Sequence, residues 1–550
     1  MTERKNKSIS GRGVIGASLL LFFFLFVCAR PAISQVRKQA RPDAQKIILK
    51  YADKVKYDEA RNPNMQIFVG NVVFSHNGLL LYCDSANFNQ ESNSFWAFGN
   101  VKMNQGDTLT LNSRYMFYDG NIQVAYASRD VVLKNRNSVL YTDSLMYDRE
   151  YQLGYFVEGG KLIDAGDTLT SDWGRYNTAN KVASFYYNVQ LNNREMRLTS
   201  DSLHYDTQTK VAHMLGKSNV FSGDSRIYTR NGYYNTQTKY AILLDSTRVV
   251  DNNQRLEADS IIYDQEKGIS QAFKNIVYND RVNKNILTGN YCYHNDSTGY
   301  TIAYDSAVVR NFSQGDTLHI HADTFKIYSY NLNTDSVYRV IHGYYHSRSF
   351  KNDIQSVADS LSYNSETCIL SLWGNPIIWN ESRQILGEEI YAFMNDSTVD
   401  SIRVVNQALM VEQLDSAHYN QITGKEMRFF FENGKLKENR VIGNVQTVYY
   451  AYDDSLMVGM NCMETSLARM FMAEKKLSKI WTKEAKGTYY ALALASRDKA
   501  FLDNFVWFDY IRPLSKDDIF VWRAKSEGTE IKKTVRRTVP YQYLDKLKKK

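Results

Sequence analysis

The sequence has little proline and little cysteine. Its 550 residues include 6 prolines and 5 cysteines, and no proline lies between Pro63 and Pro376. Proline has no N–H to donate to a sheet ladder, so a long proline-free stretch is typical of the interior of a large β-sheet. The four cysteines beyond the N-terminal region lie far apart along the chain, whereas a disulfide needs Cα atoms within about 7 Å. We therefore expect buried thiols, not a disulfide framework, at Cys83, Cys292, Cys368 and Cys462.

Catalytic and metal-binding patterns are also missing. The sequence has no Gly-rich phosphate loop, no GxSxG elbow and no Cys/His nucleophile pair. Its 9 histidines are scattered. His319 and His321 flank Ile320 on one strand face, but two ligands make only half of a zinc site. The prediction is a protein without enzymatic activity, without a metal or cofactor, and without a nucleic-acid partner.

One long hydrophobic run occurs, from Val14 to Ala29, and a basic stretch precedes it. The small-x-small pattern Ala32-Ile33-Ser34 follows. This order is typical of a secretory signal peptide and predicts cleavage before Gln35. The alternative is a retained membrane anchor, although the run is short for a spanning helix.

What the sequence does contain is a repeat of about 30 residues. One half reads "Asp-Ser-Leu-x-Tyr-Asp", as at 143–148 and 201–206, and the other reads "Gly-Asn-Val", as at 70–72 and 99–101. The Asp column from Asp84 to Asp323 gives (323−84)/8 ≈ 29.9 residues per unit. The Val column from Val72 to Val308 gives (308−72)/8 = 29.5. A fixed period of this size indicates a stacked, quasi-one-dimensional fold.

Each unit is predicted to consist of β-strands. The segment Val101-Lys102-Met103 alternates apolar and polar residues, which is the period of a half-buried strand, and turn pairs such as Gly106-Asp107 separate such segments. About 12 units lie between Val72 and Val445. If each unit adds one strand spacing of about 4.8 Å, the stack is roughly 60 Å long. The predicted fold is all-β, elongated and stacked, with a less regular C-terminal region.

The Asp column is the first candidate for a chemical site. Carboxylates on adjacent rungs would lie about 5 Å apart, close enough to share a cation. A carboxylate of this kind at a strand edge also bonds local backbone, and we favour this structural role. Asp143 and Asp148 lie five residues apart, which places them on opposite faces of an uninterrupted strand.

The repeat phrases resemble those of the organic-solvent-tolerance protein A (OstA) family, a periplasmic lipopolysaccharide-transport module. The closest matches are Ala258-Asp259-Ser260 with Tyr263, and Ala358-Asp359-Ser360 with Tyr363. The resemblance covers roughly residues 57 to 473. It implies an open, stacked β-jellyroll whose apolar interior carries lipid A acyl chains between the membranes. The chain differs from a minimal bridge protein of the family in having several times as many units.

The resemblance divides the chain into a signal peptide (1–34), an N-terminal lead (35–56), OstA-like repeats (57–320), further but less regular repeats (321–475) and a mixed C-terminal region (476–550). The Ala/Leu-rich segment from Tyr489 to Ala495 indicates a short helix within this last region. The chain ends in a basic tail, Lys548-Lys549-Lys550. This tail is either a solvated terminus or an arm for anionic headgroups or polysaccharide phosphates.

The resemblance implies a non-enzymatic bridge or scaffold in the periplasm of a Gram-negative cell, associated with the outer membrane. Its partners would be lipopolysaccharide or another glycolipid, and transport components with similar jellyroll modules. The candidate groove residues are the inward column of the repeat: Val72, Phe74, Val101, Met103, Val131, Leu133, Val189, Leu191, Val220, Val249 and Val308.

Two alternatives remain, together with one prediction about assembly. The chain could instead be a structural or adhesive β-solenoid that holds no lipid, in which case its core should be filled and sealed. An enzyme such as a polysaccharide lyase ranks third, because clustered acids or bases are missing. The first rung, at Gln66, Phe68, Val72 and Val73, is predicted to be an unpaired edge for end-to-end association.

Overall fold

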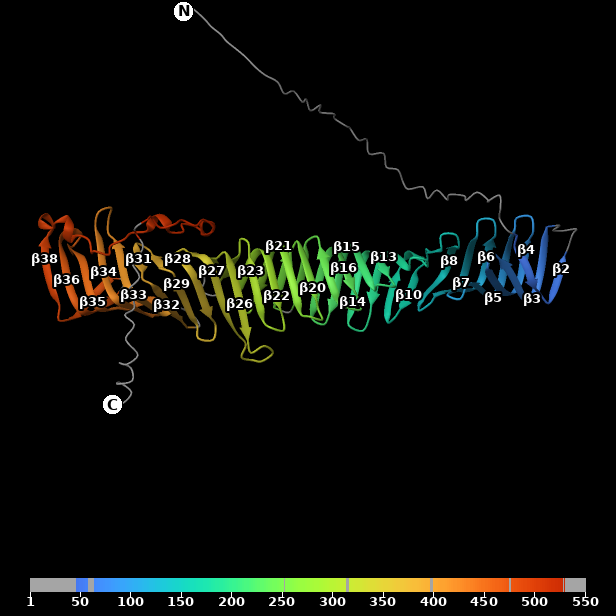
Figure 1. The fold of residues 1–550 in the computed structure, drawn as a ribbon, viewed down its shortest axis with the longest axis horizontal. Coiled ribbons are helices and arrows are strands. Elements are labelled where there is room, and N and C mark those ends of the chain that lie inside the picture. Colours follow the sequence, from blue (N-terminus) through green and yellow to red (C-terminus); the bar gives the residue numbers. More distant parts are fainter. Residues whose placement is uncertain are drawn as a thin grey trace, which may run out of the picture.

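The computed structural model describes residues 46–57, 64–251, 253–312, 316–395, 399–473, 476–527 and 529. The predicted signal peptide and the basic tail from residue 530 lie outside the described residues. The described part forms one elongated stack of antiparallel strands (Figure 1). It contains 38 strands in a single sheet and four short 3₁₀ helices, which confirms the predicted all-β, stacked fold.

Eighteen of the 38 strands are long and cross the full width of the stack. These are β3 (Met65–His76), β4 (Leu79–Asn89), β5 (Ser94–Gln105), β6 (Leu109–Asp119), β7 (Val124–Asn135), β8 (Ser138–Asp148), β13 (Val182–Asn192), β14 (Met196–Asp206), β15 (Val211–Ser222), β16 (Ser225–Asn235), β21 (Ile269–Asp280), β22 (Asn285–Asn295), β27 (Tyr338–Lys351), β28 (Ile354–Asn364), β33 (Val399–Gln413), β34 (Tyr419–Glu432), β35 (Lys435–Asp453) and β36 (Leu456–Ala473).

The other crossings are split into two short strands. These are β1 (Ile48–Tyr51) with β2 (Lys54–Tyr57), β9 (Leu153–Phe156) with β10 (Gly160–Asp164), β11 (Asp167–Ser171) with β12 (Trp173–Asn177), β17 (Tyr240–Leu244) with β18 (Thr247–Asp251), β19 (Gln254–Ala258) with β20 (Ser260–Asp264), β23 (Tyr300–Tyr304) with β24 (Val308–Asn311), β25 (Leu318–His321) with β26 (Thr324–Tyr330), β29 (Ile369–Trp373) with β30 (Ile377–Asn380), β31 (Arg383–Leu386) with β32 (Glu389–Met394), and β37 (Lys476–Lys483) with β38 (Lys486–Ala491).

One repeat unit contains two full crossings, and this sets the length of the stack. β5 pairs with β4 on one side and with β6 on the other, and β6 pairs with β7. Each unit therefore adds two strand spacings, about 10 Å. The length of roughly 60 Å expected from the sequence assumed one spacing per unit and is too short by about a factor of two.

A bend divides each crossing into two halves. In β3 the register shifts between Val69 and Val72, where Gly70 and Asn71 both have positive φ (82° and 45°). Gly99 and Asn100 repeat this geometry in β5 (68° and 43°). Two consecutive left-handed residues form a β-bulge that turns the strand sharply, and glycine and asparagine tolerate that conformation best. The "Gly-Asn" half of the repeat phrase is therefore the bend.

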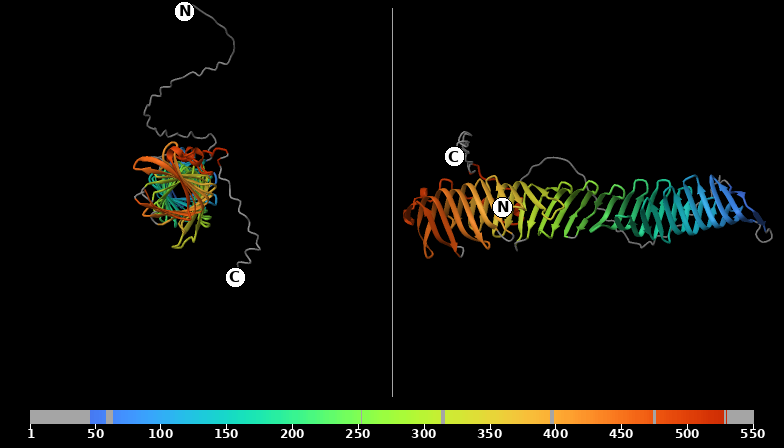
Figure 2. Two further views of the ribbon diagram at one scale, coloured as in Figure 1. Left: turned by 90° about the vertical axis from the view of Figure 1, so that its left-hand side faces the viewer. Right: turned by 90° about the horizontal axis from the view of Figure 1, so that it is seen from below.

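The bends fold the sheet into two facing leaves. Leaf A contains the strand halves 65–69, 85–89 and 94–98, which pair with one another, and the halves that continue this pairing along the stack. Leaf B contains 72–76, 79–83 and 101–105 and the halves that continue their pairing. Phe74 of leaf B stacks on Phe95 of leaf A, with ring centroids 4.6 Å apart. The end-on view shows the resulting closed cross-section (Figure 2). Opposite the bends, the turns of the two leaves meet along a line that we call the seam.

The chain returns over the outside of the stack after β38. Residues 492–527, which we call the C-terminal strap, run back along the last third of the sheet (red in Figure 1) and contain η1 (Leu492–Leu494), η2 (Arg497–Lys499), η3 (Asp509–Ile511) and η4 (Asp518–Phe520). Where the sequence indicated a short helix around Tyr489–Ala495, the structure has the end of β38 followed by the three-residue 3₁₀ helix η1.

Buried glutamine side chains bind the strap to the outer face of leaf B. Gln384 donates to the carbonyl of Val506 and accepts from the amide of Phe508. Gln421 makes the same pair of bonds to Ala500 and Leu502. Phe508 and Ile511 then complete an apolar cluster on this face with Val357, Ile377, Trp379, Leu386, Leu409 and Val411.

Candidate functional site

The interior between the leaves is the candidate site. One row of leaf B can be followed through direct strand pairs along the whole stack, and residues paired in this way share a face. It runs Leu49, Phe74, Leu81, Met103, Leu111, Leu133, Leu140, Leu162, Leu169, Leu191, Leu198, Val220, Ile227, Val249, Leu256, Tyr278, Leu287, Val309, Ile320, Ser349, Ser356, Ile378, Ile385, Met410, Ile422, Thr447 and Met463. We call it the inner row. It is apolar except near Ser349, Ser356 and Thr447.

Most of the groove residues predicted from the sequence face this interior. Eight of them are at most 1% exposed: Val72, Phe74, Val101, Met103, Val131, Leu133, Val189 and Leu191. Val220 is also buried, and Val249 packs against the same core while partly exposed. These positions are filled by neighbouring side chains of the protein itself, so in this state they line a packed core.

Val308 is a correction to the predicted groove. It pairs with Thr288 and His321, whereas the inner row passes through Val309 next to it. Alternate residues of a strand point to opposite faces, so Val308 lies on the outer face. The Val column of the sequence slips by one position here, since the number of residues between strands is not constant.

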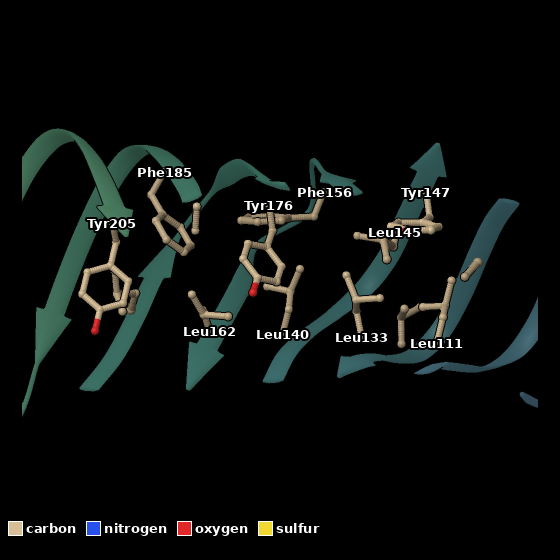
Figure 3. Packing of buried hydrophobic residues seen from close by; sticks show 14 of the residues in the cluster. Leu111, Leu133, Leu140, Leu145, Tyr147, Phe156, Leu162, Tyr176, Phe185 and Tyr205 are labelled. Atoms are coloured by element: carbon tan, nitrogen blue, oxygen red, sulfur yellow. The ribbon is translucent and has the colours of Figure 1, made fainter. Parts of the chain in front are cut away.

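A ladder of tyrosines fills leaf A. Tyr118, Tyr147, Tyr176, Tyr205, Tyr234 and Tyr263 recur every 29 residues (147−118 = 29). Each is paired on one side or both with Ala or Gly, as Tyr205 is with Ala183 and Ala212. Figure 3 shows members of the ladder opposite leucines of the inner row. We call this the tyrosine ladder. The repeat phrase contains Tyr147 and Tyr205, and the constant 29-residue spacing is visible in the sequence, but no inward position was predicted for these tyrosines.

The tyrosine hydroxyls reach the seam and are bonded there. The Tyr118 hydroxyl lies 2.8 Å from His76 Nδ1 of leaf B. That of Tyr205 donates to the carboxylates of Asp167 (2.8 Å) and Asp164 (3.1 Å), also in leaf B. Burial raises the pKa of Tyr118, and burial together with the Asp167 hydrogen bond raises that of Tyr205, so both are neutral donors at neutral pH.

Buried charged groups tie the two turns of the seam together. Arg149, in a turn of leaf A, donates to the Tyr118 hydroxyl at 2.8 Å, and to the backbone carbonyls of His76 and Asn77 in a turn of leaf B. Lys210 of leaf A forms an ion pair with Asp164 at 2.5 Å, where the Asp164 side chain is 2% exposed. Further along, Thr236 of leaf A donates to Asp167. These bonds join the two leaves across the seam at three places along this part of the stack.

The interior is less completely covered further along the stack. We call residues 47–222 the closed section and 225–350 the central section. In the central section the inner-row residues Ile227, Val249, Leu256, Tyr278, Val309 and Ile320 are partly exposed. The tyrosine ladder also ends here, because Tyr263 is followed in the pairing order by Ser270, His294 and Thr301. The apolar interior is therefore partly accessible to solvent in the central section.

The Asp column has a structural role at the bends. Asp84 accepts a hydrogen bond from the Asn100 amide at 2.9 Å, and Asp172 accepts one from Asn188 at 2.6 Å. The partner is the asparagine of the "Gly-Asn" bend on the next strand, not the local backbone that the sequence suggested. The two halves of the repeat phrase thus bind each other. The last residue of the phrase caps the turn, as Asp148 does by accepting from the amides of Glu150 and Tyr151.

The predicted docking edge is wrong in its position. Gln66, Phe68 and Val73 lie in β3, which pairs with β4 on one side and with β1 and β2 on the other. Val72 lies at the bend of the same strand. Among the described residues, the N-terminal edge is formed by β1 and β2, which the sequence had placed in or next to the N-terminal lead.

In the part of the chain that the structure describes, no group of three or more His, Cys, Asp or Glu side chains converges to hold a metal ion. Cys83, Cys292, Cys368 and Cys462 are free thiols, as expected, but only Cys83 is buried and the other three are partly exposed. Within the same residues, none of the helices has the length and apolar character to cross a membrane.

Fold and site define a repeat-built β-stack that encloses a continuous apolar interior. Residues 44–201 match the family model described as OstA-like protein. Over this segment the match supports the resemblance drawn from the repeat phrases, which points to a transport family. A comparison with curated proteins gave no match.

Proposed function

We propose that the chain is a periplasmic bridge or scaffold for lipopolysaccharide or another glycolipid, and that it contributes to outer-membrane assembly. The observation that supports this best is the inner row, which is apolar almost from end to end of a long stack. Burying an acyl chain against such a surface stabilises it by about 0.8 kcal/mol per CH₂. The OstA-like match of residues 44–201 supports the same class of function.

Acyl chains would enter at the central section. Its inner-row residues are already partly exposed, whereas the closed section is filled by the tyrosine ladder and covered by cross-seam bonds. A lipid in the closed section would have to displace buried tyrosines and separate Lys210 from Asp164. Lipid contact there would therefore require the seam to open.

End-to-end assembly would use the edge of β1 and β2. Both strands pair with β3, and their other sides carry backbone donors and acceptors that suit strand addition by a similar jellyroll module. Partners of this kind would be other transport components or a second copy of the chain.

Site-specific photocrosslinking in cells tests the lipid path. Crosslinkers at Val309 and Ile320 should capture a glycolipid, and one at Arg310, on the opposite face of the same strand as Val309, should not. Capture at Met103 in the closed section should be weaker, since that side chain is fully buried. Equal capture at Val309 and Arg310 would contradict an interior path.

A structural solenoid without lipid is the second candidate, because the interior of the closed section is filled and sealed by the protein's own side chains. Native purification followed by lipid extraction and mass spectrometry separates the two. A glycolipid in stoichiometric amount supports the bridge. Its absence from protein purified without detergent supports the structural role.

A further inference from the structure

A buried guanidinium lies on the outer face of the stack under the end of the C-terminal strap. Arg348 of β27 is 3% exposed, and its Nε and Nη1 have no hydrogen-bond partner among the described residues. It is on the same face as Val308 and His321, opposite to the interior. A charged donor left unpaired in a buried position is costly, so a group that accepts from it is expected at this place.

Aromatic side chains of the strap form the cover of this position. The Trp522 ring lies over Arg348, with the guanidinium carbon 5.5 Å from the ring centroid, and also packs on His346. Phe520 packs on His321, at 4.9 Å between centroids. Arg348 is therefore held between the sheet and the strap.

The nearby acids are bonded to other side chains. Asp518 receives two hydrogen bonds from Arg523, and Asp323 is bonded to His346 at 2.7 Å. Burial lowers the pKa of Arg348 to about 10, which still leaves it charged at neutral pH. His321 uses its Nδ1 on the carbonyl of Ala307. The charge of Arg348 thus lacks a bonded counterion.

We propose that Arg348, beneath Trp522, is a binding site for a phosphate-type oxyanion. A guanidinium binds two oxygens of such a group along either of its two edges, Nε with Nη2 or Nη1 with Nη2, and each edge of Arg348 has one unpaired nitrogen. The phosphate could be free or part of a lipid headgroup. The site lies on the outer face and does not depend on the proposed transport function. A bound oxyanion would hold the strap end against β27.

Titration of the full-length protein with inorganic phosphate at constant ionic strength tests this site. Phosphate should slow hydrogen exchange of residues 518–525, and calorimetry should give saturable binding. Arg348→Gln should remove both effects. Arg348→Lys keeps the charge but loses the fork, and it should bind at least about tenfold more weakly. Arg310→Gln is the matched control on the neighbouring strand face and should behave like the parent.

A second arm identifies the source of the phosphate. Phosphatidylcholine vesicles with and without phosphatidic acid are added to the parent and to Arg348→Gln. Arg348-dependent binding to the phosphatidic acid vesicles assigns a lipid headgroup, and a response to inorganic phosphate alone assigns a free anion. If wild-type protein shows no saturable phosphate or vesicle effect, or if Arg348→Gln and Arg310→Gln respond like the parent, the two nitrogens are merely hydrated and the proposal is wrong.

Discussion

The closed section and the central section share one backbone plan but differ inside. Both are built from bent antiparallel strands, and the inner row passes through them without interruption. In the closed section, large tyrosines alternate with Ala or Gly and fill the space between the leaves. In the central section the ladder ends at Tyr263. Ser270, His294 and Thr301 take the following positions, and most of the inner row is partly exposed. The repeat thus sets the shape of the stack, while one ladder position sets how far its interior is filled.

The largest effect is expected from removing a tyrosine of the ladder. Tyr205→Ala deletes a fully buried ring and takes a donor from two buried carboxylates, so it should cost about 3–5 kcal/mol. Tyr263→Ala, at the matched ladder position in the central section, removes a partly exposed ring and should cost clearly less. Hydrogen exchange of the flanking strands measures each local free energy of opening.

The corresponding phenylalanine variants separate packing from hydrogen bonding. Tyr205→Phe should still cost about 1–3 kcal/mol, because Asp164 and Asp167 lose a donor. Tyr263→Phe should be nearly neutral, as no hydrogen bond of its hydroxyl is found within the described residues. Equal costs of the two phenylalanine variants would mean that the hydrogen bonds of the Tyr205 hydroxyl do not distinguish the sections.

Breaking the cross-seam ion pair should have the next largest effect. Lys210→Met leaves the carboxylate of Asp164 without its cation in a position where the side chain is 2% exposed, and should cost about 2–3 kcal/mol. The matched change in the central section is Arg248→Met, whose ion pair with Glu257 is exposed (48% and 33%) and should cost at most about 1 kcal/mol.

The readout for this pair is local. Faster exchange of the turns at 164–167 and 207–210, with β5 unchanged, would show that the seam opens there without general unfolding. Lys210→Arg, which keeps the charge, should restore most of the protection. Identical effects of the Lys210 and Arg248 variants would show that the closed section owes nothing to its buried charges.

Changes at the bends should have smaller effects, and glycine should be the more stable residue at this position in both sections. In Gly99→Ala the added Cβ would clash with the Asp84 carboxylate, and the residue would have to keep a φ of +68°. The substitution should cost about 1–3 kcal/mol. In the central section the same position is Lys274, at a φ of +58°, so Lys274→Gly should be stabilising by up to about 1 kcal/mol. Thermal unfolding of the two variants with the parent measures both signs.

The sequence predicted the strands, the repeat and most inward positions because strand alternation and a fixed period are local signals. It did not predict that the "Gly-Asn" bend folds each strand in two, since that requires knowing that Asp84 and Asn100 meet across strands. For the same reason, it did not predict that the tyrosine ladder and the cross-seam bonds cover the interior. Asp164 lies 41 residues from Tyr205 and 46 residues from Lys210, in the other leaf, and only the bend brings it to them. Val308 was misplaced because one extra residue reverses the face of a strand.

The smallest expected effect concerns pH and the strap, a feature that neither the closed nor most of the central section has. Burial lowers the pKa of His321 below its usual value of about 6.5, and Arg348 lowers it further, against the opposing effect of the Ala307 carbonyl. The folded state thus favours neutral His321. The stability that this difference in pKa contributes is fully present above about pH 6.5 and is lost as the pH falls through the lower pKa of His321 in the folded state. Asp323 and His346 are the other titratable groups beside it.

Hydrogen exchange of residues 518–525, corrected for the intrinsic rate, should quicken between pH 7.5 and pH 5.5 while β5 stays constant. His321→Gln should flatten this dependence; a strap that responds to pH equally well without His321 would assign the effect to His346 and Asp323 instead.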